Sequence, residues 1–147
     1  KQIEQKRVYF NDRVYAEQGI RIQEGPFGIS SRAALELEKY AETHGKGGAF
    51  HHAVEEAYWR YGQDISQQEV LAGLMTQAGL PSADVNSILA DTQYAQAVDA
   101  DVWQAQQYGL QGVPAVVVQN KYLISGAQPY PVFQQVMAKV LSEQAEG

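Results

Sequence analysis

The stretch Gly112-Val113-Pro114-Ala115-Val116-Val117-Val118 decides the fold class of this 147-residue chain. From Ala115 onward it is rich in β-branched residues and predicts a short strand, and Tyr122-Leu123-Ile124-Ser125 predicts a second one. Asn120-Lys121 between them is typical of a tight hairpin turn. Because the three valines do not alternate with polar residues, we expect both faces of the first strand to be covered.

A hairpin of this kind needs partners, because two strands alone are marginally stable in water at best. Every other element that the sequence predicts is a helix. Either the hairpin packs wholly against these helices, or its partner strands come from an upstream segment or another chain. The sequence favours missing strands, and a chain that begins at Lys1 rather than methionine agrees with an upstream segment.

Helical spacing of apolar residues predicts six helices before the hairpin. Four of them should end at a glycine, the residue most often found just past a helix end; these glycines are Gly19, Gly45, Gly62 and Gly109. The third helix is expected to place five residues on one stripe, namely Phe50, Val54, Ala57, Tyr58 and Tyr61.

Helix starts are predicted from capping residues. Ser30 or Ser31 should cap the second helix, and Asp91 or Thr92 the sixth. Ser66-Gln67-Gln68-Glu69 has the capping-box pattern and predicts the start of a fourth helix. Pro131 is expected at the first position of a final helix after the hairpin.

The composition excludes several functions. The net charge is -6 and the basic residues are scattered, so nucleic acid is not an expected partner. No apolar run approaches the roughly 20 residues that span a bilayer, and we expect a soluble protein without a membrane segment. The chain has no cysteine, which excludes a disulfide, a thiolate zinc site and a cysteine nucleophile within these residues.

Neither a metal nor a cofactor is predicted. The three histidines, His44, His51 and His52, are separated by glycines at 45, 47 and 48 or point in different directions, so we interpret them as hydrogen-bonded surface residues. The aromatic residues could line a ligand groove but are more typical of core or helix contacts; they are Tyr58, Trp59, Tyr61, Trp103 and Tyr108.

The end of the chain resembles a known family. Tyr108-Gly109-Leu110, Gln111-Gly112-Val113-Pro114 and Ser125-Gly126-Ala127-Gln128-Pro129 follow one another as in the DsbA-like thiol-disulfide oxidoreductases, particularly their cytoplasmic FrnE-like branch. Residues 31–69 resemble the multi-helix insertion of that branch. The resemblance implies an α/β, thioredoxin-like fold of DsbA type that is predominantly helical here and lacks the N-terminal βαβ unit.

The same resemblance implies one compact domain with two regions, a helical insertion over residues 1–109 and a C-terminal ββα portion over residues 110–147. It also implies a site. Pro114 would follow a cis peptide bond beside the family's cysteine pair, and Val113, with Gly112, would present its backbone to an extended peptide. Gly126 and Gln128 are possible ligand contacts, although a glycine after a strand usually serves backbone geometry.

We therefore expect part of a cytoplasmic protein-disulfide oxidoreductase or isomerase whose substrates are disulfide-containing proteins or peptides. The family's Cys-x-x-Cys has no counterpart here, so the chain alone should be inactive. One alternative is a glutathione-dependent enzyme resembling 2-hydroxychromene-2-carboxylate isomerase and kappa glutathione transferases. Another is a non-catalytic interaction module, with a homo-oligomer formed through the exposed sheet edge.

Overall fold

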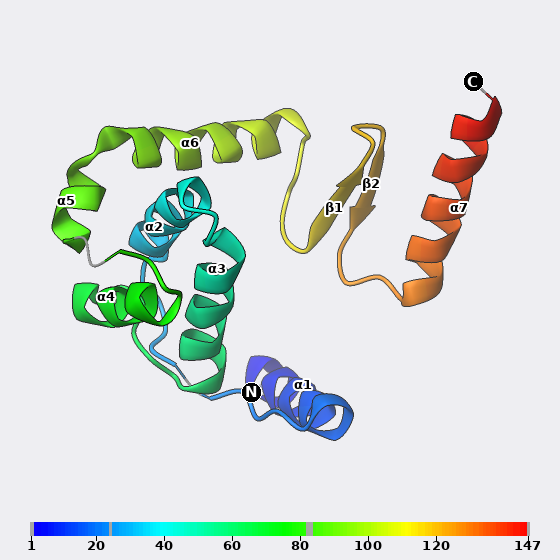
Figure 1. The fold of residues 1–147 in the computed structure, drawn as a ribbon. Helices are drawn as coiled ribbons and strands as arrows, with labels where there is room; N and C mark the ends of the chain where they lie inside the picture. Colours follow the sequence, from blue (N-terminus) through cyan, green and yellow to red (C-terminus); the bar gives the residue numbers. More distant parts are fainter. Residues whose placement is uncertain (1, 24, 82–83, 147) are drawn as a thin grey trace. The chain divides into compact units, whose positions relative to one another are not determined.

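The computed structural model of the protein describes residues 2–23, 25–81 and 84–146, and the chain divides into two compact units, residues 1–100 and 101–147 (Figure 1). The elements are α1 (Gln2–Gln18), α2 (Arg32–Thr43), α3 (Gly47–Glu55), the π-helical turn η1 (Glu56–Arg60), α4 (Gln68–Gln77), α5 (Val85–Ala90), α6 (Thr92–Gln107), β1 (Ala115–Val118), β2 (Tyr122–Ser125) and α7 (Tyr130–Glu146). The predicted order of six helices, a hairpin and a last helix is confirmed.

The core of the first unit lies among α2, α3, α4 and α5, which pack against one another. Its largest fully buried side chains are Leu37, Phe50 and Leu71, one from each of α2, α3 and α4. Phe50 was expected on an apolar helix face, and the burial of all three side chains removes a large apolar surface from water. No helix of the described residues is long and apolar enough to cross a membrane.

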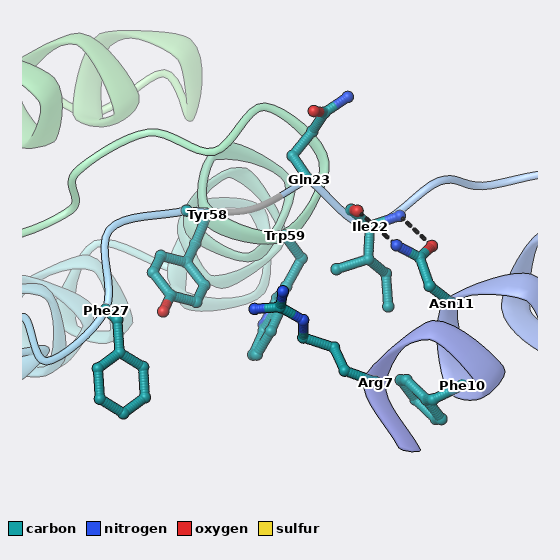
Figure 2. A pocket seen from close by; sticks show the side chains of 9 residues that line it. Arg7, Phe10, Asn11, Ile22, Gln23, Phe27, Tyr58 and Trp59 are labelled. Atoms are coloured by element: carbon teal, nitrogen blue, oxygen red, sulfur yellow. Dashed lines mark hydrogen bonds between the residues drawn. The ribbon is translucent and has the colours of Figure 1, made fainter. Parts of the chain in front are cut away.

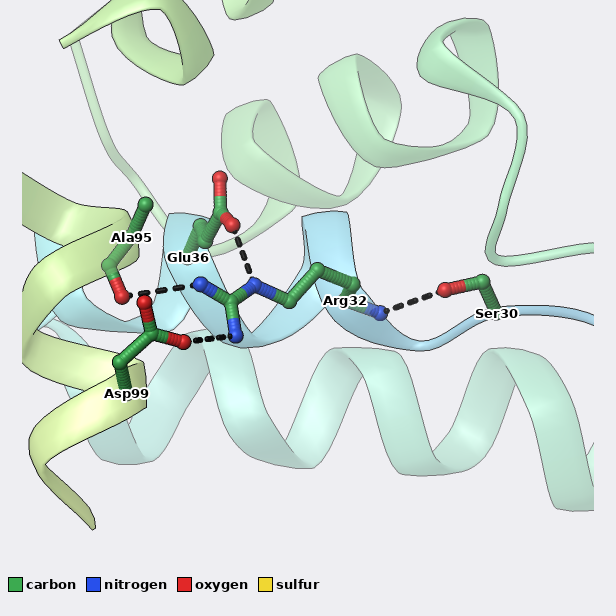
Figure 3. A network of polar contacts seen from close by, with 5 residues as sticks. All are labelled: Ser30, Arg32, Glu36, Ala95 and Asp99. Carbon is green, nitrogen blue, oxygen red and sulfur yellow. Dashed lines mark hydrogen bonds and ion pairs between the residues drawn. The ribbon is translucent and has the colours of Figure 1, made fainter. Parts of the chain in front are cut away.

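A polar network joins the start of α2 to α6 (Figure 3). The Arg32 guanidinium donates to Glu36 at 2.5 Å, to Asp99 at 2.6 Å and to the Ala95 carbonyl at 2.9 Å. The bonds to Asp99 and Glu36 raise the pKa of Arg32 above its usual value. Ser30 Oγ accepts the Arg32 N–H at 3.2 Å, so Ser30, rather than Ser31, provides the side-chain bond at this helix start.

The stripe predicted for the third helix is interrupted by η1. The Tyr61 N–H donates to the Glu56 carbonyl five residues earlier, at 3.1 Å, which is the pattern of a π turn. The additional residue in the turn rotates the side chains that follow it relative to the α-helical period. Phe50 and Ala57 are buried as expected, but Tyr61 is 60% exposed, so its predicted place on the stripe is wrong.

The capping box predicted at residues 66–69 is also wrong. The carboxylate of Asp64 organises this turn, because it accepts the Ser66 hydroxyl at 2.6 Å, the Ser66 N–H at 3.0 Å and the Gln67 side-chain amide at 3.0 Å. These bonds, the Ser66 hydroxyl first, lower the pKa of Asp64. The serine is therefore a donor to the preceding aspartate rather than the cap of α4, which begins at Gln68.

In the second unit, β1 and β2 form an antiparallel pair with Ala115 opposite Ser125 and Val118 opposite Tyr122. The Lys121 N–H donates to the Val118 carbonyl at 3.1 Å, and the two residues between them, Gln119 and Asn120, have φ of +54° and +51°. Positive φ at both central positions is the requirement of a type I′ turn. The turn predicted at Asn120-Lys121 therefore lies one residue earlier.

One face of the hairpin contacts α7. Glu143 of α7 accepts the Tyr122 hydroxyl and lies 2.7 Å from Lys121 Nζ, and Val140, one turn earlier, is buried. These bonds, Lys121 first, lower the pKa of Glu143, and the bond to Glu143 raises the pKa of Lys121. Val116 and Leu123 are 41% and 50% exposed. The expected covering of both strand faces is therefore not found among the described residues.

Candidate functional site

The predicted site begins where α6 ends. Gly109 has a φ of +66°, a conformation that glycine adopts without steric cost, and the Leu110 N–H donates back to the Ala105 carbonyl at 3.1 Å. The chain then leaves the helix axis and enters the loop 111–114, whose residues are all exposed. The loop leads directly into β1.

Val113 stands out in this loop as a large apolar residue with 95% of its surface accessible. Its peptide bond to Pro114 is cis. Among the residues that the structure describes, none forms a hydrogen bond with the backbone N–H or C=O of Val113. The backbone of Val113 is thus open to a partner that approaches from solvent.

The structure brings Pro114 and Gly126 together. The Gly126 N–H donates to the Pro114 carbonyl at 2.9 Å, which extends the hairpin ladder by one bond beyond Ala115 and Ser125. Gly126 has a φ of +77°, so this turn suits glycine better than any residue with a side chain. The loop that carries Val113 is therefore held at its C-terminal end by the turn after β2.

Gln128 is engaged within that turn. Its side-chain amide donates to the Ser125 carbonyl at 2.8 Å, and its N–H donates to the Gly126 carbonyl at 2.9 Å. The side chain therefore stabilises the turn that holds Gly126. Gly112, Val113 and Pro114 lie on one loop and Gly126 touches it, whereas the amide group of Gln128 is directed to its own turn.

The loop 111–114 has backbone groups that suit an extended peptide, but it carries no side chain that could react with a disulfide. An exposed residue with an unpaired backbone next to a strand can accept and donate the main-chain bonds that an extended peptide needs. The sequence contains no cysteine that could attack a disulfide there. Chemistry on a disulfide at this loop requires a thiol from elsewhere.

The histidines lie far along the chain from this loop, in the first unit. His51 Nδ1 lies 3.0 Å from Glu38, and its Nε2 lies 3.5 Å from Glu55. His44 Nδ1 lies 2.9 Å from the Tyr40 carbonyl. The surface position predicted for the three histidines is confirmed: His44 and His51 are exposed and hydrogen-bonded, and His52 is exposed, with its Nε2 3.9 Å from Glu56.

A pocket of about 460 Å³ in the first unit was not predicted (Figure 2). It is lined by residues of α1, of the following connection and of η1; they are Arg7, Phe10, Asn11, Ile22, Gln23, Gly25, Phe27, Tyr58 and Trp59. Tyr58 and Trp59 belong to the aromatic series for which core or helix contacts were favoured over a ligand groove, and Trp59 is 54% exposed. No local pattern marks the pocket, because it depends on contacts between segments that are distant in the sequence.

Comparison with known proteins identifies the family of this fold. A family model of the DsbA-like thioredoxin domain matches residues 13–138. A search of curated proteins gave no match. A solved structure of a "probable DsbA oxidoreductase" from Streptomyces coelicolor is similar, with a TM-score of 0.85, 29% sequence identity and 97% of this chain covered.

A second solved structure, of a candidate protein disulfide isomerase from Nitrosomonas europaea, has a TM-score of 0.71 and 18% identity, over 95% of this chain and 74% of that chain. At this identity the likeness shows the fold alone. The present chain spans 62% of the length of the Streptomyces protein. The fold class expected from the sequence, a DsbA-type thioredoxin-like fold rich in helices, is confirmed, and the chain belongs to the DsbA-like thioredoxin domain family.

Proposed function

We propose that this chain is part of a protein-disulfide oxidoreductase or isomerase in which Gly112, Val113 and Pro114 bind the peptide around a substrate disulfide. The observation that carries the proposal is the open backbone of Val113, 95% exposed and without a hydrogen bond among the described residues. An extended peptide that pairs with this backbone would be oriented along β1. Such pairing gives affinity through the main chain and tolerates many substrate sequences.

The reaction that fits this loop is thiol-disulfide exchange. A thiolate attacks one sulfur of the substrate disulfide, a mixed disulfide forms, and the second substrate sulfur leaves as a thiolate. A second thiol of the enzyme then attacks the mixed disulfide, which releases the reduced substrate and leaves an oxidised enzyme. Since the 147 residues contain no cysteine, both enzyme thiols would lie outside them.

Gly126 and Gln128 have positioning roles in this proposal. The Gly126 N–H fixes the Pro114 carbonyl, and the Gln128 amide fixes the turn that contains Gly126. Together they hold the loop on which Val113 is presented. A cytoplasmic location and self-association through the sheet edge stay predictions.

The test compares Val113→Pro with Gln111→Pro in the full-length protein. Val113→Pro removes the N–H that would pair with the substrate, while Gln111→Pro changes an exposed residue of the same loop. We expect KM for a peptide disulfide to rise about three- to tenfold in Val113→Pro only, the loss of roughly one hydrogen bond. Turnover of bis(2-hydroxyethyl) disulfide, which has no peptide group that could pair with the loop, should stay unchanged.

Equal losses with the small and the peptide disulfide, or equal losses in both variants, would contradict the assigned role of Val113. The 147-residue chain alone should show no disulfide reductase activity in any redox buffer, and activity there would overturn the proposal. A full-length protein that binds glutathione but reduces no protein disulfide would instead support the glutathione-dependent alternative.

A further inference from the structure

The loop that carries Val113 is attached to the hairpin at its start as well as at its end. Tyr108 directly follows α6, and its hydroxyl donates to the side-chain oxygen of Asn120 at 3.0 Å. Asn120 lies in the turn between β1 and β2. A side chain just before the loop therefore binds the tip of the hairpin, 12 residues further along the chain.

The two attachments lie at opposite ends of β1. Pro114, whose carbonyl accepts the Gly126 N–H, comes directly before the strand. Asn120 comes after the last residue of the strand, Val118. Since strand residues rise about 3.3 Å each, the attachments are separated by roughly 13 Å, the length of the strand. The loop therefore leads from the level of the hairpin turn back to the start of β1.

The length of the loop does not by itself fix its path. A chain spans up to about 3.3–3.6 Å per residue, so the segment 108–114 could reach roughly 20 Å, farther than the strand is long. Among the described residues, the backbone of residues 111–113 forms no hydrogen bond. The bonds of Tyr108 and Pro114 are the polar contacts that join this part of the described chain to the hairpin, so they restrict where the loop can lie.

The surroundings of Tyr108 and Asn120 suit them to this bond. Gln104, one turn earlier on α6, donates to the Tyr108 hydroxyl oxygen in a longer contact of 3.5 Å, which leaves the phenolic proton to Asn120. The Tyr108 side chain is half-buried, so water competes less for the bond. Asn120 has a φ of +51°, a conformation that asparagine adopts more readily than most residues. Asn120 therefore serves both the turn and the contact.

We propose that Tyr108 and Asn120 are positioning residues that hold the backbone of Val113 ready for an extended peptide. The inference rests on the peptide-binding role proposed above for Val113 and adds how its loop is kept in place. A loop that is already ordered loses less conformational freedom when a peptide pairs with it, so the peptide binds more tightly. Because Tyr108 and Asn120 act through the loop, they affect peptide binding rather than thiol-disulfide exchange itself.

The test measures the kinetics of the full-length protein with a peptide disulfide. Tyr108→Phe removes only the hydroxyl, and we expect KM to rise about three- to tenfold with kcat unchanged, the loss of roughly one hydrogen bond. Asn120→Gly should have the same effect, because glycine keeps the positive φ of the turn but lacks the side-chain oxygen. The double variant should be no worse than either single variant, since all three lack the same bond.

Two further variants separate positioning of the loop from a general loss of stability. Asn120→Asp keeps an oxygen that accepts the Tyr108 hydroxyl and should retain the KM of the unchanged protein. Tyr122→Phe removes another hydroxyl bond of the same hairpin, the one to Glu143 of α7, and should leave KM for the peptide unaltered. The NMR order parameter of the Val113 amide should fall in Tyr108→Phe but not in Tyr122→Phe.

The positioning role is overturned if Tyr108→Phe and Tyr122→Phe raise KM equally, or if Tyr108→Phe lowers kcat and leaves KM unchanged. It is also overturned if Asn120→Asp behaves like Asn120→Gly, since the accepting oxygen would then contribute nothing. A raised KM in Val113→Pro but not in Tyr108→Phe would contradict the positioning role and leave the peptide-binding role of Val113 intact. An unchanged KM in Val113→Pro would instead contradict the peptide-binding role itself.

Discussion

The helical unit and the hairpin unit of this chain are stabilised in different ways. Of the described apolar residues that are buried, all but two lie within residues 1–100, and most of these form one continuous core. In the described part of residues 101–147, only Ile124 and Val140 are buried. A short hairpin with one helix has little apolar surface to remove from water, so individual polar contacts matter more there.

The difference follows from the sequence patterns of the two units. Apolar stripes on α2, α3 and α4 face one another and supply a core without help from any strand. β1 and β2 instead carry apolar residues toward both faces, and Val116 and Leu123 stay exposed. The hairpin is held to α7 through Lys121, Tyr122 and Glu143. The unit that carries the proposed peptide-binding loop therefore has the smaller apolar core.

The largest effect is expected from Phe50→Ala in the helical unit. Phe50 is completely buried, and its removal leaves a cavity in the core, so the free energy of unfolding should fall by about 3–5 kcal/mol. The same substitution at fully exposed Phe27 should change it by no more than about 0.5 kcal/mol. Denaturant unfolding followed by circular dichroism measures both. Similar losses in the two variants would contradict the position of the core.

A smaller effect is expected from Val140→Ala in the hairpin unit. The substitution removes the apolar surface of two buried methyl groups. At full burial this surface contributes about 1.5–2 kcal/mol to the free energy of unfolding. Because the local core is small, the loss should appear as faster hydrogen exchange of the amides in β1 and β2, with the α2 and α3 amides unchanged. Val102→Ala, at a position that is 49% exposed, is the matched control and should leave all of these rates unaltered.

The sequence predicted the helices well because local signals define them. Gly19, Gly45, Gly62 and Gly109 each follow a helical segment and have positive φ, a conformation that favours glycine. The apolar spacing of the third predicted helix likewise placed Phe50 and Ala57 on its buried face. These features depend on residues within one or two turns of each other, which a single sequence contains.

Where a prediction from the sequence was wrong, the cause was either a competing residue nearby in the chain or a contact between residues that are distant in the sequence. Ser66 matched the capping-box pattern, but Asp64, two residues earlier, is a stronger acceptor and binds the serine itself. The hairpin turn lies one residue earlier than predicted because Gln119 has a positive φ. The sequence did not indicate this, since glutamine has no special preference for that conformation. The pocket depends on Asn11 reaching Ile22 and on the π turn at Trp59, and neither contact has a pattern in the sequence.

The smallest effect is expected from Glu143→Gln, which tests the polar contact of the hairpin unit. The pKa of Glu143 is lowered from its ordinary 4.5 in the folded state, so its contribution is present above that pH and is lost as the pH falls through the folded value. The pKa of Lys121 is raised above 10.5, so its contribution is lost only as the pH rises through that higher value. The ion pair between Glu143 and Lys121 should therefore persist between about pH 4.5 and 10.5.

Hydrogen exchange of the Tyr122 and Ile124 amides should accelerate below pH 4.5, beyond the intrinsic pH dependence of exchange, in the unchanged protein. In Glu143→Gln these amides should exchange faster already at neutral pH, with little further loss in acid. The control is Gln135→Ala at an exposed position of the same helix, which should behave like the unchanged protein.

The helical unit has its own acid-sensitive carboxylate, since the pKa of Asp64 is lowered by its bonds to Ser66 and Gln67. Asp64→Asn should therefore flatten the acid response of the α4 amides alone, as hydrogen exchange would measure. If either Asp64→Asn or Glu143→Gln changed the acid response of both units, the two units would not be stabilised separately, and the contrast between them would fail.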